Sequence, residues 1–212
     1  MSMWNLNKNR VISIFAILLL TICLALPALG KEAKLAKNIT SLQAFDILQN
    51  GGGKVYLIDV RTPGEYQQIG HPQMAYNIPF KFLSDKFVEK GKMFRGKKMK
   101  KTRYQYYKNS EFSSYMKEHF KTGDTLLIMC RSGNRSVPAS DLLVQQGFKN
   151  VFNVINGFEG GKLKGSGDKE HALLKKYSNN YARRGFNGGW KYYGLPWTYT
   201  MNPKFVYESH KK

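Results

Sequence analysis

Short apolar segments alternate with amphipathic ones through the central part of the chain. Residues 55–60, 125–129 and 151–155 are almost uninterrupted apolar runs, a pattern typical of short strands that are buried on both faces. Residues 74–78 form a weaker strand candidate, because Pro79 stops the run. Amphipathic segments separate these runs, so we expect helices between the strands.

Three helices are predicted. The first covers residues 42–48, with Thr40 or Ser41 as its amino-terminal cap and its apolar residues mainly on one face. The second begins near residue 110, and the third covers residues 136–146. The second helix would bring together four apolar residues: Phe112, Tyr115, Met116 and Phe120. This alternation predicts an α/β fold with a central, mainly parallel sheet flanked by helices.

The chain is strongly basic. Its 212 residues hold 34 Lys and Arg against 14 Asp and Glu, a formal net charge of +20. The content of 42% hydrophobic and 14% aromatic residues supports a packed core and argues against a mostly disordered chain. An acidic protein is excluded, and the length favours one domain with additions over two full-sized domains.

Two stretches lie outside the alternating pattern. Residues 81–108 hold eleven Lys and Arg, two acidic residues and several tyrosines, and residues 162–188 are polar and rich in Gly and Asn. We expect both to be surface insertions in a single domain of residues 31–200. Residues 201–212 are interpreted as a basic C-terminal tail.

The first thirty residues resemble an export signal. Lys8 and Arg10 precede an apolar run over residues 11–26, and small residues at 28 and 30 would place a cleavage site before Lys31. We therefore expect an exported protein, in the bacterial periplasm. Two alternatives stay open, namely an uncleaved membrane anchor over residues 11–30 and a lipoprotein cut at Cys23. If the signal is removed, the mature chain holds one cysteine, Cys130.

Cys130 follows a predicted strand and precedes a predicted helix. In a parallel sheet, this junction is where ligands bind, because helix amino termini present free N–H groups and a positive dipole end. Two arginines in the intervening loop add positive charge, so the surroundings favour an anion and the thiolate form of Cys130. The plain alternative is a buried structural cysteine. The loop residues are Arg131, Ser132, Gly133, Asn134, Arg135 and Ser136.

The loop CRSGNRS resembles the active-site loop of the rhodanese sulfurtransferase family. Residues 59–66, 70–79, 147–160 and 189–197 are similar to further family segments in the same order. The resemblance implies a rhodanese-like α/β domain and an enzyme that carries sulfur as a persulfide on Cys130. It would take sulfur from thiosulfate or a related anionic donor and pass it to cyanide or a thiol.

The resemblance also suggests roles for other residues. Arg131 and Arg135 would hold the dianionic donor, while Gly133 keeps the loop tight enough for its N–H groups to converge on the sulfur. Four further residues match the family pattern, and we expect them to support the structure: Asp59, Arg61, Glu65 and His71.

Rival chemistries fit less well. A cysteine phosphatase needs five residues between its Cys and Arg, whereas four separate Cys130 from Arg135. The four histidines are scattered without the paired spacing of a metal site. We therefore expect neither a metal nor a cofactor.

A second function hypothesis rests on residues 81–108. This basic stretch could be a solvated surface, or it could dock an acidic partner protein or an anionic membrane surface. Nucleic acid is the least favoured partner, because the protein is expected to be exported. In this second hypothesis the domain is a binding module that carries a persulfide or senses an anion.

Overall fold

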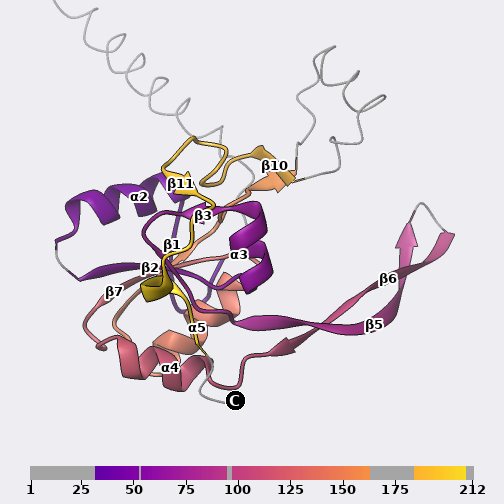
Figure 1. Cartoon of the computed structure of the whole chain (residues 1–212), viewed down its shortest axis with the longest axis horizontal. Coiled ribbons are helices and arrows are strands. Elements are labelled where there is room, and N and C mark those ends of the chain that lie inside the picture. The colour runs from indigo at the N-terminus through magenta and orange to yellow at the C-terminus, as the bar shows by residue number, and fades with distance from the viewer. Residues whose placement is uncertain (1–31, 53, 95–96, 163–183, 209–212) are drawn as a thin grey trace, which may run out of the picture.

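The computed structural model describes residues 32–52, 54–94, 97–162 and 184–208 (Figure 1). Its centre is a five-stranded sheet in the order β1-β8-β7-β2-β4, in which all neighbouring strands are parallel. The predicted parallel sheet is confirmed. Its strands are β1 (Lys37–Ile39), β2 (Val55–Asp59), β4 (Ala75–Asn77), β7 (Thr125–Met129) and β8 (Asn150–Val154).

The three predicted helices are confirmed as α2 (Ser41–Asn50), α4 (Phe112–His119) and α5 (Ser136–Gln145). Thr40 caps α2 through a capping box with Gln43. The expected apolar face of α2 is only partly correct, since Leu42 is 49% exposed.

A fourth helix, α3 (Pro63–Ile69), was not predicted. Thr62 caps it through a second capping box with Glu65, and Pro63 occupies its first turn, where a missing N–H costs nothing. This short helix carries Glu65 toward the carboxyl end of the sheet.

The core has two halves, one on each side of the sheet. Ile58, Leu126 and Ile128 face a cluster that includes side chains of α4 and α5. Leu57 and Leu127, which alternate with them along the strands, face a second cluster with α2 and Trp190. The predicted grouping of apolar residues on α4 is confirmed, because Phe112, Met116 and Phe120 are buried together with Tyr115 packed against them.

The basic stretch forms a regular structure. β5 (Lys81–Phe94) and β6 (Lys97–Lys108) pair as an antiparallel hairpin that projects from the body of the domain (Figure 1). Asn109 closes its base by donating a backbone hydrogen bond to the Phe80 carbonyl at 3.2 Å. The insertion is therefore an ordered arm attached at the edge of the fold.

The C-terminal segment differs from the expected tail. The η2 turn (Pro203–Phe205) lies beside β4, and the Tyr207 N–H donates to the Asn77 carbonyl at 3.0 Å. Tyr207 is only 9% exposed and belongs to the core. The part of this segment that the structure describes, up to residue 208, is thus packed against the domain.

Two small antiparallel pairs complete the fold. β3 (His71–Pro72) pairs with β11 (Trp197–Thr198), and β9 (Gly161–Lys162) pairs with β10 (Arg184–Asn187). The expected signal over residues 1–30 lies outside the described residues, as do residues 163–183 of the insertion at 162–188. Within the described part of the chain, none of the helices has the length and apolar character needed to span a membrane.

Candidate active site

Cys130 lies directly after β7, at the carboxyl end of the central strand of the sheet. β2 ends beside it, since Asp59 pairs with Met129 in the strand register. The chain then turns through residues 131–135 into α5. The expected placement between a strand and a helix amino terminus is confirmed.

The loop backbone points two N–H groups at the sulfur. The amides of Gly133 and Arg135 donate to Cys130 Sγ over 3.2 and 3.4 Å. Gly133 has a φ of 91°, a left-handed conformation that favours glycine and that lets the loop close this tightly. Cys130 is 1% exposed, so these donors act on a desolvated sulfur and stabilise negative charge on it.

The turn at residues 157–159 supports the cysteine loop. The N–H groups of Phe158 and Glu159 donate to the carbonyls of Cys130 and Arg131 at 2.8 and 3.0 Å. The close approach requires Gly157, because a Cβ at that position would lie 2.4 Å from the Cys130 carbonyl oxygen. The Gly157 carbonyl in turn accepts a hydrogen bond from the Ser41 hydroxyl at 2.9 Å. The sulfur-binding loop is therefore fixed by backbone contacts.

Arg135 forms a bidentate ion pair with Glu65 of α3. Its two terminal nitrogens donate to the carboxylate oxygens at 2.5 and 2.7 Å. Burial alone would raise the pKa of the Glu65 carboxyl, but the Arg135 bonds and charge, together with the Thr62 hydrogen bonds, lower it to about 2. The same pair raises the pKa of the Arg135 guanidinium, against the effect of its burial.

This pair changes the role expected for Arg135. We expected its side chain to hold the dianionic donor, yet the guanidinium already has a carboxylate partner. What Arg135 gives to the sulfur directly is its backbone N–H. The other loop arginine, Arg131, also lines the pocket, and among the described residues no ion pair joins it to a carboxylate.

A pocket of about 490 Å³ opens over the loop. Five of its lining residues come from the loop and five from the β5–β6 hairpin, which therefore forms one wall of the pocket. The loop supplies Cys130, Arg131, Ser132, Asn134 and Arg135, and the hairpin supplies Lys81, Val88, Arg103, Gln105 and Tyr106. The wall carries positive charge as well, and the Tyr106 ring centroid lies 5.9 Å from the Arg135 guanidinium carbon.

The hairpin residues are the part of the pocket that sequence reasoning missed. The alternation of lysines, arginines and tyrosines indicated a binding surface, but strand pairing was needed to show that Lys81, Arg103 and Tyr106 face the cysteine loop. Ser136, by contrast, is fully buried at the start of α5, and its hydroxyl has no hydrogen-bond partner among the described residues.

Three of the expected supporting residues, Asp59, Arg61 and His71, are buried. Arg61 binds the Asp59 carboxylate at 2.6 Å and the Gly70 carbonyl at 2.8 Å, and both side chains are fully buried. His71 stacks on Tyr66 with a centroid distance of 3.6 Å. These contacts connect β2, α3 and β3, so the side chains organise the turns that carry Glu65.

The α/β domain thus places a buried cysteine after its central strand, with two backbone N–H donors on the sulfur and positive side chains in the pocket beside it. The sequence model of the rhodanese-like domain matches residues 41–164. The chain belongs to the rhodanese-like domain family.

Relatives agree with this assignment. An uncharacterized protein of Rickettsia prowazekii, RP600, is 30% identical over 167 residues, which are 78% of this chain and 99% of that protein. Thiosulfate sulfurtransferase 16 of Arabidopsis thaliana is 30% identical over 130 residues, 61% of this chain and 90% of that protein. The crystal structure of Rv0390 from M. tuberculosis matches with a TM-score of 0.53 and 25% identity, covering 79% of this chain and all of that one. The family thus includes proteins named as sulfurtransferases.

Proposed function

We propose that the protein is a sulfurtransferase that carries a sulfur atom as a persulfide on Cys130. The observation that supports this most directly is the convergence of the Gly133 and Arg135 N–H groups on the buried Sγ. Such donors stabilise the thiolate before the reaction and the terminal sulfur of a persulfide after it. The Arabidopsis relative named thiosulfate sulfurtransferase supports the choice of donor.

In the loading step, the Cys130 thiolate attacks the outer sulfur of thiosulfate. A new S–S bond forms to Cys130, the S–S bond within thiosulfate breaks, and sulfite leaves with that electron pair. Arg131 at the pocket and the positive side chains of Lys81 and Arg103 attract the dianion and offset the charge that builds up near the sulfur.

In the unloading step, an acceptor attacks the outer sulfur of the persulfide. With cyanide as acceptor, a carbon–sulfur bond forms, the persulfide S–S bond breaks and Cys130 leaves as the thiolate. The product is thiocyanate, and the enzyme returns to its starting form. The loop amides stabilise the leaving thiolate, so neither step needs a separate general base.

Replacing the sulfur tests this function. We expect Cys130→Ser and Cys130→Ala to abolish thiocyanate formation from thiosulfate and cyanide. The unchanged thermal unfolding temperature of each variant would show that the fold persists, because both changes are small. Turnover that survives either substitution would contradict the proposal.

A second candidate function is a binding module that carries a persulfide or senses an anion for one docked acidic partner. The hairpin favours it, because half of the residues that line the pocket belong to this basic arm. Neutralising Lys100, which is 80% exposed, together with neighbouring lysines tests the docking role. Loss of partner binding with unchanged transfer to cyanide supports docking on the hairpin, and equal loss of both would show that these charges serve the active site or the fold.

We also propose that the chain acts after export. The apolar run over residues 11–26 and the small residues before Lys31 support this. N-terminal sequencing of the protein from a bacterial periplasmic extract tests it. A sequence beginning at Lys31 is the expected result, and a cytoplasmic chain beginning at Met1 would contradict it.

A further inference from the structure

One face of the β5–β6 hairpin carries large apolar side chains that are exposed to solvent. Leu83 is opposite Tyr106 and Phe87 is opposite Tyr104 in the strand register. Tyr104 and Tyr106 are two positions apart on β6, so all four residues share a face. Their exposed fractions are 46% for Leu83, 64% for Phe87, 44% for Tyr104 and 39% for Tyr106. We call these four residues the hairpin strip.

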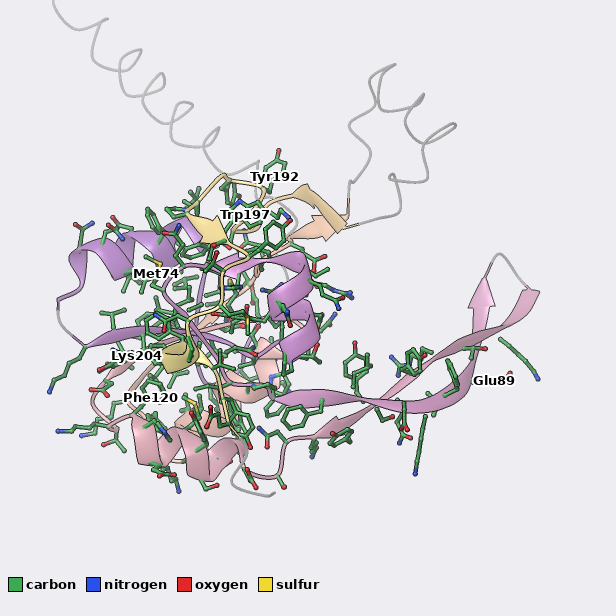
Figure 2. The ribbon with its side chains drawn as sticks, in the orientation of Figure 1. Met74, Glu89, Phe120, Tyr192, Trp197 and Lys204 are labelled. Carbon is green, nitrogen blue, oxygen red and sulfur yellow. The ribbon has the colours of Figure 1, made fainter. Side chains whose placement is uncertain are left out.

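The hairpin strip is ordered and begins at the active site. The rings of Phe87 and Tyr104 stack with a centroid distance of 4.4 Å, so they form a preformed platform. Tyr106 lines the pocket over Cys130. From there the arm extends away from the body, toward Glu89 in Figure 2. A molecule bound along the strip therefore contacts Tyr106, a residue that also lines the pocket.

The charge around the strip selects the kind of partner. Residues 81–108 hold eleven Lys and Arg against Asp85 and Glu89, and Lys86 and Arg103 are exposed on the same hairpin. A second copy of this chain, with its net charge of +20, would be repelled. An acidic polypeptide with apolar side chains matches both the charge and the aromatic platform.

The pocket indicates what such a partner does. At about 490 Å³ it lies within the range of roughly 300–1,000 Å³ typical of sites for ligands much larger than thiosulfate. A lipid headgroup or a nucleic acid on the hairpin strip would offer no sulfur acceptor to Cys130. A thiol on a bound polypeptide can enter the pocket and reach Cys130.

We propose that the hairpin strip docks an acidic polypeptide whose cysteine thiol accepts sulfur from Cys130. The inference rests on the proposed persulfide chemistry. The partner thiolate attacks the outer sulfur, the S–S bond to Cys130 breaks, and Cys130 leaves as the thiolate. The partner is then the persulfide, and no further reactant is needed.

Two synthetic peptides of equal length, each with one cysteine, provide the probe. One carries Asp and Glu around Leu and Phe, and the other carries Asn and Gln at the same acidic positions. Cys130 is loaded with thiosulfate, and the rate of sulfur transfer to each peptide and to cyanide is measured.

The test variant is Phe87→Ala/Tyr104→Ala, which removes two residues that do not line the pocket. Tyr192→Ala is the control, since Tyr192 is 54% exposed and lies on the body of the domain (Figure 2).

We expect wild-type protein to prefer the acidic peptide over the neutral one, and the preference to fade with added salt. The double variant should transfer to the acidic peptide about tenfold more slowly, as truncated aromatic anchors do, with transfer to cyanide unchanged. Tyr192→Ala should match wild type. A second variant, Lys86→Gln/Lys100→Gln, keeps the aromatic platform and should lose the preference for the acidic peptide.

Equal transfer to both peptides, or an unaffected rate in both hairpin variants, would overturn the inference. It would also be overturned if wild type bound anionic phosphatidylglycerol vesicles and the double variant lost this binding while its transfer to the peptide stayed unchanged. If Cys130 takes up no sulfur at all, the proposed function fails instead. Binding of the same acidic peptide with Ser in place of Cys, followed by fluorescence anisotropy, then still tests the surface. Loss of that binding in the double variant supports the surface, and equal binding to both proteins rejects it.

Discussion

Glu65 and Arg135 are joined by a bidentate ion pair that connects the first turn of α3 to the residue that caps α5. The same Arg135 donates its backbone N–H to the sulfur of Cys130. A carboxylate seventy residues away in the sequence therefore fixes the backbone of the sulfur-binding loop. Glu65 is best described as a positioning residue.

The ion pair makes stability depend on pH. Because the pKa of Glu65 falls from 4.5 to about 2 in the folded chain, the unfolded chain binds this proton more readily. The stabilisation is complete above about pH 4.5 and is lost as the pH falls toward 2. It amounts to roughly 3 kcal/mol.

Glu65→Gln checks this dependence. We expect the variant to unfold at lower urea concentration than wild type at pH 7, with the difference shrinking as the pH approaches 3. Transfer should also slow, because Arg135 loses its anchor. Glu118→Gln, at an exposed position of α4, is the control. If the difference in urea stability between Glu65→Gln and wild type stays constant with pH, the ion pair of Glu65 is not the source of the pH dependence.

Gly157 tests the backbone support of the loop. An added Cβ would meet the Cys130 and Arg131 carbonyl groups at 2.4–2.8 Å, so Gly157→Ala must displace the loop. Gly194→Ala is a matched control, since φ is similar, 65° against 61°, and nothing lies within 4 Å of its Cβ. We expect the control to cost about 1 kcal/mol of left-handed strain and to keep full activity. Gly157→Ala should lower kcat about tenfold or more. Equal activities would show that the contact does not position the sulfur.

Arg103 tests whether the hairpin wall takes part in donor binding. We expect Arg103→Gln to raise KM for thiosulfate about threefold to tenfold with kcat nearly unchanged, because it removes a charge that attracts the donor. Lys204→Gln removes the same charge at an exposed site outside the pocket (Figure 2). If both variants raise KM equally, net charge and not the hairpin wall accounts for the effect.

The buried Asp59–Arg61 pair is expected to be structural. Asp59→Asn leaves the Arg61 charge without its carboxylate at full burial, so we expect a loss of about 3–5 kcal/mol in urea unfolding. The double variant Asp59→Leu/Arg61→Leu should lose less stability than Asp59→Asn, because it leaves no buried charge unpaired. A single variant as stable as wild type would contradict this.

Much of the fold could be predicted because local patterns determine it. The apolar runs marked β2, β7 and β8, and Thr40 marked the start of α2. β1 and the β3–β11 pair were missed, because strands of two or three residues show no periodicity and depend on distant partners. The helix α3 was not predicted, although Thr62 and Glu65 form a capping box that the sequence displays.

The site divides in the same way. Cys130 and its loop could be located from a strand, a glycine and two arginines that are close in sequence. The partner of Arg135 could not be found, because Glu65 reaches it only through the folding of α3 against the loop. The hairpin wall of the pocket could not be predicted for a similar reason. Residues 81–108 are distant from Cys130 in the sequence, and only the folded hairpin brings them to the pocket.

Intact mass of the protein before and after incubation with thiosulfate tests the central claim most directly. We expect a gain of one sulfur atom, release of one sulfite for each loaded chain, and removal of the added mass by cyanide. Cys130→Ser should show no gain. An unchanged mass in a folded protein whose Cys130 still reacts with an alkylating reagent would contradict sulfur transfer from thiosulfate through this cysteine.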